Sequence, residues 1–356
     1  MSYKIEDTVR VVIVDVHHLN TALSVLARYV DRKLRPAFSE LKIFIPLRET
    51  PPSSVLEFLR HKLGAEFTWM IPNIFPRKTR SLSLKALEKQ VGLPVPKSVS
   101  IVGDILLINE LPENAEGLEY EIGKLLLQNF GVRAVFLKTQ KVSGVERVPT
   151  WQKLAGWGDT FTVHRENACW FALDISKVFF NPRLGNERLR VSKLVKDNEV
   201  VVDMFAGVGP FAILIRKTSG ATVYAIDINR HAVEFMKLNS KLNKVEINVL
   251  EGDARLKVME VEKPATRVIM NYPEGSVNFI EAALKVLGGS GVMHLYVFCD
   301  DNKLDKLRSE VIDRIQKMGS YVENMLTRIV SEVAPRRYLC CLDIALQKTK
   351  LLKSGF

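Results

Sequence analysis

The chain has 356 residues, of which 47% are hydrophobic, so it is long enough to bury the cores of two or three domains. No apolar run reaches transmembrane length and the first residues do not resemble a signal peptide, which argues against a membrane or secreted protein and favours a cytoplasmic one. The formal net charge of +11 favours a polyanionic partner.

Residues 1–55 predict a small independent α/β module. Residues 9–16 form a strand-like apolar run, residues 20–35 carry apolar side chains at helical spacing, and residues 41–46 predict a second strand. The segment 48–54, rich in proline and serine, is typical of a linker. No catalytic constellation lies here, so we expect the module to serve either partner recognition or stabilisation.

Residues 56–175 mix predicted helices and strands and are expected to form a middle domain. Within residues 100–109, Gly103 and Asp104 lead into a predicted apolar strand, and residues 116–130 predict an amphipathic helix. The segment 75–80 is basic and contains a proline, so it either meets phosphates or is a solvated face. The residues expected to contact RNA phosphates here are Arg77, Lys78 and Arg80.

The stretch from Val200 to Phe211 organises the rest of the chain. A short apolar run at 200–202 predicts a buried parallel strand, and Asp203 closes it. Gly207 and Gly209 permit a tight turn and a close approach of backbone to a ligand. The helix that follows offers free N–H groups to an anion, so this stretch predicts a nucleotide-cofactor site.

Three further predicted strands also end in polar residues: Asp227 follows 222–226, Asp253 follows 247–250, and Asn271 follows 267–270. Asp227 is placed to accept hydrogen bonds from a ribose diol, and Asp253 to reach an adenine amine. Asp203 is placed to hold the charged amine of a methionine. These features favour S-adenosylmethionine over a nicotinamide. The run from Gly207 to Ala212 also fits the dinucleotide pattern G-x-G-x-x-A, so an NAD-dependent oxidoreductase is an alternative.

The C-terminal part of the chain continues the alternation of strands and helices. The last two predicted strands, 322–333 and 338–346, would form an antiparallel hairpin at the sheet edge, which is typical of class I methyltransferases and foreign to most dinucleotide folds. The expected fold is α/β, with a class I, Rossmann-like methyltransferase domain at 176–356 that is preceded by two smaller α+β domains at 1–55 and 56–175.

Four cysteines are present, and none shows the C-x-x-C spacing of a metal site: Cys169, Cys299, Cys340 and Cys341. The adjacent pair Cys340 and Cys341 would point to opposite faces of a strand. We expect reduced, buried thiols and no metal.

Several long motifs occur in a fixed order along the chain: I-V-G-D at 101–104, G-V-E-R at 144–147, H-R-E-N at 164–167, F-N-P-R-L-G-N-E-R at 180–188, D-M-F-A-G-V-G-P-F at 203–211 and N-Y-P at 271–273. Through these motifs the sequence resembles the archaeal- and eukaryotic-type tRNA (guanine-37 N1)-methyltransferases, and the resemblance covers nearly the whole chain. The resemblance implies an N-terminal module that reads tRNA shape, a middle RNA-binding domain, and methyl transfer from S-adenosylmethionine to N1 of the guanine beside the anticodon. We expect tRNA as the partner, no membrane association and a monomer.

The resemblance places a general base at Glu187, a substrate-orienting arginine at Arg147 and a base-contacting asparagine at Asn271. Guanine N1 carries a proton at neutral pH, so a carboxylate that accepts it and an arginine that stabilises charge on O6 suit the reaction. Without the resemblance, Glu187 would be an ordinary carboxylate at a helix start. The residues expected to bind the cofactor are Arg183, Asp203, Phe205, Gly207, Gly209, Asp227, Ile228, Asp253, Asn271 and Pro273.

One departure concerns Tyr272, which stands where the family usually has leucine in Asn-Leu-Pro. A related branch methylates C7 of the tricyclic wyosine precursor (4-demethylwyosine) at the same tRNA position, with or without the N1 activity, and Tyr272 would suit a re-tuned pocket beside the substrate. The sister family that transfers an aminocarboxypropyl group is disfavoured because it lacks the Pro182–Leu184 and Asn-x-Pro pattern. A non-catalytic tRNA binder is the remaining alternative.

Overall fold

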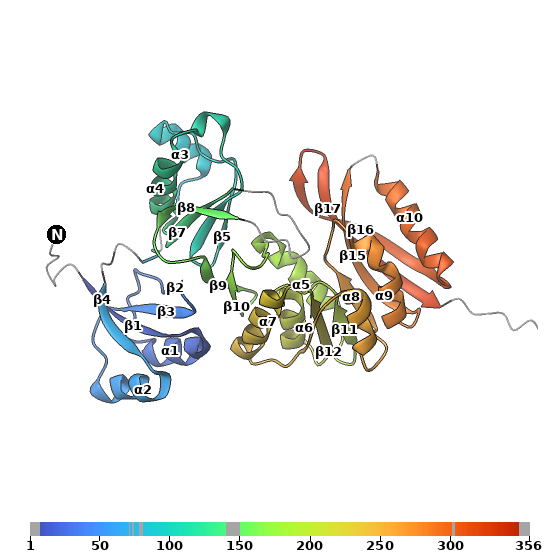
Figure 1. Cartoon of the computed structure of the whole chain (residues 1–356), viewed down its shortest axis with the longest axis horizontal. Coiled ribbons are helices and arrows are strands. Elements are labelled where there is room, and N and C mark those ends of the chain that lie inside the picture. Colours follow the sequence, from blue (N-terminus) through green and yellow to red (C-terminus); the bar gives the residue numbers. More distant parts are fainter. Residues whose placement is uncertain are drawn as a thin grey trace, which may run out of the picture. The chain divides into compact units, whose positions relative to one another are not determined.

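The structure is a computed structural model and describes residues 8–70, 72, 75–77, 81–139, 150–300 and 303–348. The chain divides into two compact units, Met1–Pro182 and Arg183–Phe356 (Figure 1). Each unit has its own sheets and its own hydrophobic cores.

The first sheet of unit 1 is antiparallel, in the order β2-β3-β1-β4. Its elements are β1 (Val9–Asp15), η2 (Val16–His18), α1 (Leu19–Leu26), β2 (Ala37–Ser39), β3 (Lys42–Leu47), α2 (Ser53–Leu63) and β4 (Glu66–Met70). The two predicted strands are confirmed. The sheet extends past the expected boundary at residue 55, because β4 pairs with β1.

The predicted helix 20–35 is wrong in its length. Helix α1 ends at Leu26, and the chain then leaves helical geometry to form isolated β-bridges from Val30 to Leu47 and from Leu34 to Arg77. Pairing with segments that are distant in the sequence therefore prevents the longer helix that the spacing of apolar residues predicts.

The second sheet of unit 1 has the order β5-β6-β7-β8, in which only β6 and β7 are parallel. Its region contains α3 (Leu84–Val91), β5 (Val99–Val102), β6 (Ile105–Ile108), η4 (Glu113–Ala115), α4 (Glu119–Phe130), β7 (Ala134–Lys138) and β8 (Trp151–Gly156), followed by the hairpin of β9 (Phe161–Glu166) and β10 (Cys169–Asp174). The apolar strand predicted after Gly103 and Asp104 is confirmed as β6, and these two residues form the turn between β5 and β6.

A buried ion pair ties the two sheets of unit 1 together. Arg133 is only 1% exposed, and its Nε donates to Asp104 Oδ2 at 2.9 Å. The same Oδ2 accepts the backbone N–H of Phe38, in β2, at 2.9 Å. Arg133 also donates to the carbonyl oxygens of Trp157 and Phe161, at 2.6 and 2.9 Å. The last residue of the I-V-G-D motif is therefore a structural carboxylate that joins the sheets.

Unit 2 contains one sheet of seven strands in the order β13-β12-β11-β14-β15-β17-β16. The strands are β11 (Val200–Asp203), β12 (Thr222–Asp227), β13 (Asn248–Glu251), β14 (Arg267–Met270), β15 (Gly291–Asp300), β16 (Ser320–Ala334) and β17 (Arg337–Lys348). The first five are parallel, and β17 and β16 add an antiparallel hairpin at the edge (Figure 1). The predicted class I methyltransferase topology is confirmed.

Helices cover both faces of this sheet. The core on one face contains residues of α8 (Ala254–Lys257), η6 (Val258–Glu260), α9 (Ile280–Val286) and α10 (Leu304–Lys317). The core on the other face contains residues of η5 (Pro182–Leu184), α5 (Gly185–Leu194), α6 (Pro210–Thr218) and α7 (Arg230–Asn243). The short η7 (Ser276–Phe279) precedes α9. The central strands are mostly apolar because both of their faces are buried.

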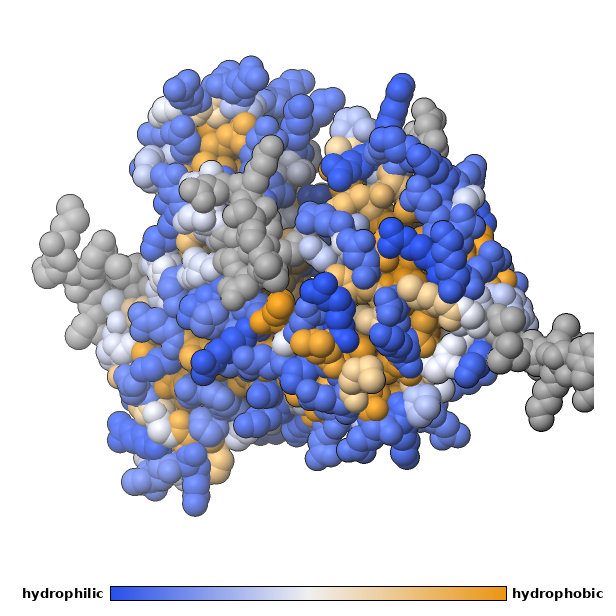
Figure 2. All heavy atoms as spheres, turned by 45° about the vertical axis from the view of Figure 1, so that its right-hand side comes forward, coloured by the Kyte–Doolittle hydropathy of each residue, from blue (hydrophilic) through white to orange (hydrophobic). Residues whose placement is uncertain are grey.

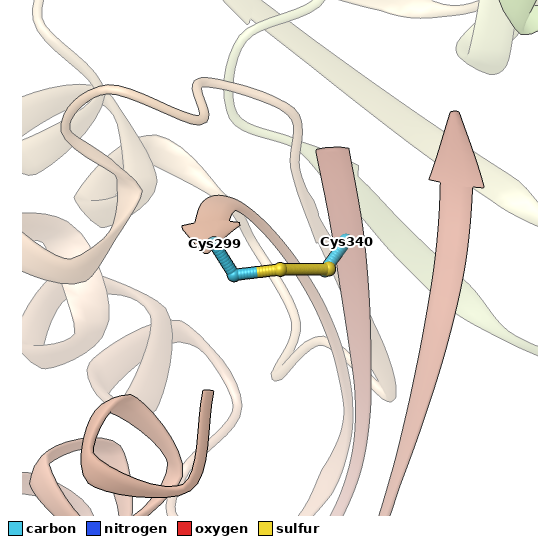
Figure 3. The surroundings of a disulfide bond; sticks show 2 residues. All are labelled: Cys299 and Cys340. Carbon is cyan, nitrogen blue, oxygen red and sulfur yellow. A yellow bond between two sulfur atoms is a disulfide. The ribbon is translucent and has the colours of Figure 1, made fainter. Parts of the chain in front are cut away.

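The expectation of four reduced thiols is wrong for one pair. Cys299 of β15 and Cys340 of β17 form a disulfide across neighbouring antiparallel strands (Figure 3). Cys299 pairs with Tyr338 and Cys340 with Val297, so the two cysteines are diagonal neighbours on one face of the sheet. Their separation of 41 residues hides this proximity in the sequence. Cys169 and Cys341 are buried and form no disulfide, and Cys341 lies on the opposite face from Cys340, as predicted.

Hydrophilic residues predominate on the face shown in Figure 2, and apolar residues show between them. Among the described residues, the most exposed large apolar side chains are Leu256, Met259 and Leu326, at 71%, 71% and 61%. No described helix is both long enough and apolar enough to cross a bilayer.

Candidate active site

Four polar residues lie at the carboxyl ends of neighbouring parallel strands in unit 2. Asp203 ends β11, Asp227 ends β12, Asp253 follows β13 and Asn271 follows β14. Since parallel strands place their carboxyl ends at the same edge of a sheet, the structure brings these residues to one edge, where open α/β folds bind ligands.

The glycine loop after β11 has the geometry that the sequence predicts. Gly207 and Gly209 have φ values of 55° and 87°. A Cβ on Gly209 would lie 2.9 Å from Met236 Cγ, so the loop also requires glycine for space. Pro210 then opens α6, whose first residues supply backbone N–H groups.

Asp227 fixes this loop while facing the ligand edge. Its Oδ2 accepts the Gly207 N–H at 2.6 Å and its Oδ1 accepts the Asn229 N–H at 2.9 Å. Burial raises the pKa of Asp227, and these backbone hydrogen bonds oppose the rise. Each carboxylate oxygen has two lone pairs, so a ribose diol can share oxygens that already hold the loop.

Asp203 carries an orphaned acceptor. It is 1% exposed, and its Oδ2 has no hydrogen-bond partner among the described residues. Burial raises the pKa of Asp203 to about 7; the Phe205 N–H opposes the rise, the Asp227 carboxylate adds to it and Arg188 opposes it. A buried carboxyl group of this kind is completed by a cation. S-adenosylmethionine presents a charged amine as well as a ribose diol, so the described residues fit that cofactor.

Asp253 makes contacts that the sequence does not predict. It caps α8, and its carboxylate accepts hydrogen bonds from the backbone and side-chain nitrogens of Arg255. These hydrogen bonds lower the pKa of Asp253. The guanidinium of Arg255 in turn lies 5.2 Å from the ring centroid of Phe279. The expected contact from Asp253 to the adenine amine stays a prediction.

Three aromatic rings pack together beside the strand ends. Phe205 lies 5.2 Å from Tyr272 and 4.9 Å from Phe279 between ring centroids, and Tyr272 lies 6.2 Å from Phe279. The hydroxyl of Ser276 accepts the Tyr272 N–H at 3.1 Å and lies 2.8 Å from the carbonyl oxygen of Met270. Ser276 therefore holds the Asn-Tyr-Pro turn in place. The rings of Phe205, Tyr272 and Phe279 together form an aromatic wall. Sequence analysis missed Phe279, whose role depends on this packing.

Glu187 is buried in the first turn of α5, with 4% of its surface exposed. Its Oε1 accepts hydrogen bonds from Arg190 Nη2 at 2.7 Å and from the Tyr296 hydroxyl at 2.8 Å. Its Oε2 accepts from Arg190 Nε at 2.9 Å. The Tyr296 ring also packs against Phe211 of α6, with ring centroids 5.9 Å apart. The sequence analysis identified Glu187 but missed Arg190 and Tyr296.

The other predicted site residues are placed as follows. Arg183 is exposed in η5 before α5, Ile228 is 45% exposed after β12, and Asn271 and Pro273 are half-buried after β14. In unit 1, Arg77 is exposed and its backbone N–H donates to the Gly131 carbonyl oxygen at 2.9 Å. Arg147, Lys78 and Arg80 lie outside the described residues.

His164 makes structural contacts within unit 1. Its Nδ1 accepts the Gly103 N–H at 3.1 Å, and its Nε2 lies 3.5 Å from a carboxylate oxygen of Glu166. Phe180 packs against the imidazole with ring centroids 5.1 Å apart. The H-R-E-N motif therefore supports the turn between β5 and β6.

Two family models match successive parts of this chain. A family model for the TRM5/TYW2 methyltransferase domain matches residues 162–325, and one for the TYW2 N-terminal domain matches residues 80–160. The tRNA (guanine(37)-N(1))-methyltransferase Trm5b of Methanocaldococcus jannaschii is 36% identical over 317 residues, which cover 86% of this chain and 89% of that protein. The tRNA 4-demethylwyosine(37)-methyltransferase Taw21 of Saccharolobus solfataricus is 36% identical over 255 residues, covering 70% and 93%.

Among solved structures, the complex of aTrm5 with tRNALeu has a TM-score of 0.64 and 32% sequence identity, and the match covers 95% of this chain and 99% of that one. The matches to Trm5b and to aTrm5 cover 86% and 95% of this chain. The chain therefore belongs to the TRM5/TYW2 methyltransferase family.

Proposed function

We propose that this protein transfers a methyl group from S-adenosylmethionine to N1 of guanosine 37 of tRNA. The observation that carries the proposal is the geometry of Glu187, a buried carboxylate that accepts hydrogen bonds from Arg190 and Tyr296 in the methyltransferase domain. The 36% identity to Trm5b of M. jannaschii, over most of both chains, supports the same reaction.

Glu187 is the general base in this proposal. Guanine N1 carries a proton and is a poor nucleophile until that proton leaves. Oε2 of Glu187 accepts one hydrogen bond among the described residues, and Oε1 accepts two, so Oε2 keeps lone-pair capacity for the N1 proton. The N1–H bond breaks as the O–H bond forms on Glu187, which frees an electron pair on N1 for the methyl group that the bound cofactor would supply.

The cofactor, when bound, supplies an electrophilic methyl group on a sulfonium that becomes a neutral thioether. Asp203 holds the methionine amine, and Asp227 accepts the ribose hydroxyls. Gly207 and Gly209 admit the ligand close to the backbone. The remaining proposed cofactor contacts are Arg183, Phe205, Ile228, Asp253, Asn271 and Pro273. Asn271 also contacts the target base, and Arg147 stabilises the charge that grows on O6.

The RNA partner is supported by charge. The net charge of +11 suits a polyanion, and the basic segment with Arg77, Lys78 and Arg80 is proposed to meet phosphates. The target guanine must leave its stack to reach Glu187, and the aromatic wall of Phe205, Tyr272 and Phe279 offers a surface beside which an unstacked base can pack. We propose that the protein acts as a cytoplasmic monomer.

A second candidate activity is methylation of C7 of 4-demethylwyosine at the same position, alone or in addition. Two observations favour it: Tyr272 replaces the usual leucine within the aromatic wall, and Taw21 of S. solfataricus is 36% identical over 93% of its length. The C7 target is a carbon with different proton demands, so it need not depend on Glu187.

One experiment tests both activities. Purified protein and S-adenosylmethionine are incubated with unmodified tRNA and, separately, with tRNA that carries 4-demethylwyosine, and the nucleosides are then identified by mass spectrometry. The proposed function predicts 1-methylguanosine from the first substrate. A methylated tricyclic base from the second would establish the additional activity. The absence of methylated nucleoside from both substrates would overturn the proposal.

A further inference from the structure

The candidate base belongs to a larger network of buried charges. Residues His294 and Tyr296 of β15, and Cys341 and Asp343 of β17, alternate along their strands and point to the same face of the sheet. Helix α5, which carries Glu187 and Arg190, packs on that face. Asp343 and His294 are direct cross-strand partners, so the register of the hairpin brings them together.

Arg190 has two carboxylate partners. One edge of its guanidinium binds Glu187, and Nη1 and Nη2 also donate to Asp343 at 2.7 and 3.2 Å. The side chain of Arg190 is 20% exposed, and that of Asp343 is 18% exposed. Burial alone would raise the pKa of Asp343, but hydrogen bonds from His294 and Arg190 outweigh it and hold that pKa well below its ordinary range. Asp343 is therefore negatively charged. The guanidinium of Arg190 is shared between the carboxylates of Asp343 and Glu187.

His294 is fixed as a neutral donor. Its Nε2 lies 2.8 Å from Arg267 Nη1, and arginine nitrogens only donate hydrogen bonds, so Nε2 must accept. The ring proton is then on Nδ1, which donates to Asp343 Oδ1 at 2.5 Å. Burial lowers the pKa of His294, which agrees with a neutral ring. Arg267 is held in turn by Glu199, at 2.7 Å.

A metal site is a poor alternative for this group. One ligand atom each from His294, Cys341 and Asp343 lie within 4.8 Å of one another. Both imidazole nitrogens, however, are already committed to Asp343 and Arg267, so neither has a free lone pair for an ion. The cluster is better explained as a network of hydrogen bonds.

The geometry points to Asp343 and His294 as positioning residues for methyl transfer, which hold Arg190 in place and share its charge so that Glu187 stays oriented and sufficiently basic to take the N1 proton. This inference rests on the proposed role of Glu187. A carboxylate paired with a whole guanidinium is a weak proton acceptor, because protonation breaks the ion pair. Arg190 pairs with Asp343 as well as with Glu187. The hydrogen bond from His294 holds Asp343 in the orientation that binds Arg190.

The charged and titratable groups around Glu187 all contribute to this balance. They are Arg190 on α5, Tyr296 on β15, Arg328 on β16 at 3.6 Å, and Cys341 and Asp343 on β17. Without the negative charge of Asp343, Arg190 would form its ion pair with Glu187 alone. The ionised form of Glu187 is then favoured, and its affinity for a proton falls.

The test measures single-turnover methyl transfer against pH for the parent and for Asp343→Asn. We expect the plateau rate to fall by about 10–100-fold, the loss that a small misplacement of a reacting group causes. We also expect the midpoint of the rising limb to move to lower pH. Asp313→Asn, an exposed aspartate of α10, is the matched control and should keep the parent profile.

His294 gives a second, independent variant pair. Asn places an amide donor where Nδ1 stands, so His294→Asn should keep most of the parent rate, whereas His294→Leu should resemble Asp343→Asn. Unfolding curves and binding of S-adenosylhomocysteine establish that each variant is folded. An Asp343→Asn enzyme with the parent plateau and midpoint, or with a lower plateau and an unmoved midpoint, would overturn the inference.

Failure of the proposed function is recognised separately. Glu187→Gln that methylates N1 at the parent rate removes the base assignment, whatever Asp343→Asn does. If instead Glu187→Gln loses activity and Asp343→Asn retains the parent profile, only the positioning role is wrong.

Discussion

At the scale of single residues, two carboxylates of the proposed site have different surroundings. Glu187 is buried with a hydrogen-bond donor on each carboxylate oxygen, whereas Asp203 is buried with one oxygen unpartnered among the described residues. The first arrangement keeps a carboxylate oriented for proton transfer. The second leaves room for a cation.

For Glu187→Gln we expect folding and cofactor binding close to those of the parent and a large loss of N1 methyl transfer. The amide is nearly isosteric with the carboxylate but cannot usefully accept the proton, and general-base catalysis is worth about 10²–10⁴ in rate. Single-turnover assays measure this loss. Glu310→Gln, an exposed glutamate of α10, serves as the control and should change nothing.

Asp203 makes both stability and cofactor binding depend on pH. The folded-state pKa of about 7 lies above the unfolded value, so its contribution to stability is full below about pH 3.9 and is lost as pH rises through about 7. Asp203→Asn should therefore flatten the pH dependence of unfolding in that window when no cofactor is present.

The same group should bind a cationic amine better when it is ionised. Affinity for S-adenosylhomocysteine, measured by calorimetry, should rise from roughly pH 6 to 8 in the parent and stay low and flat in Asp203→Asn. A variant that kept the parent affinity and slope would show that Asp203 does not hold the amine.

At the scale of elements, the turn from β11 into α6 sets the cofactor site. Gly209→Ala should destabilise the fold by about 1–2 kcal/mol through its positive φ and, in addition, should weaken S-adenosylhomocysteine binding because the new Cβ meets Met236. Gly64 at the end of α2 has a φ of 60°, but an added Cβ there would meet nothing within 4 Å, so Gly64→Ala is the control for backbone strain alone. Denaturation and calorimetry on both variants separate the two effects. Equal losses of stability with parental binding in Gly209→Ala would contradict the steric argument.

At the scale of the whole molecule, the excess of basic residues should govern RNA binding. A protein that neutralises about 6–10 phosphates loses about 10³–10⁵ in affinity between about 50 and 200 mM salt. We expect tRNA binding to fall steeply with salt, whereas binding of S-adenosylhomocysteine should change little. Filter binding or fluorescence anisotropy measures the slope, and a flat response would argue against an RNA substrate.

The sequence by itself determined the features that depend on neighbouring residues. Apolar runs that end in Asp203 and Asp227 mark buried parallel strands, and the two glycines mark a turn that no other residue fits well, so the sheet and the cofactor edge follow from local pattern. The final antiparallel hairpin also follows from local pattern. The helix 20–35 was predicted too long because β-bridges to distant segments compete with helical spacing.

Only the tertiary structure decided which distant side chains meet. His294 and Asp343 are 49 residues apart, and only the register of β15 and β17 sets them opposite each other. The same register joins Cys299 to Cys340. Arg190 binds Asp343 across 153 residues because α5 packs on that face of the sheet. Local pattern identifies Glu187 as a carboxylate in the first turn of a helix. The residues around it that lie on strands are brought together only when the sheet forms.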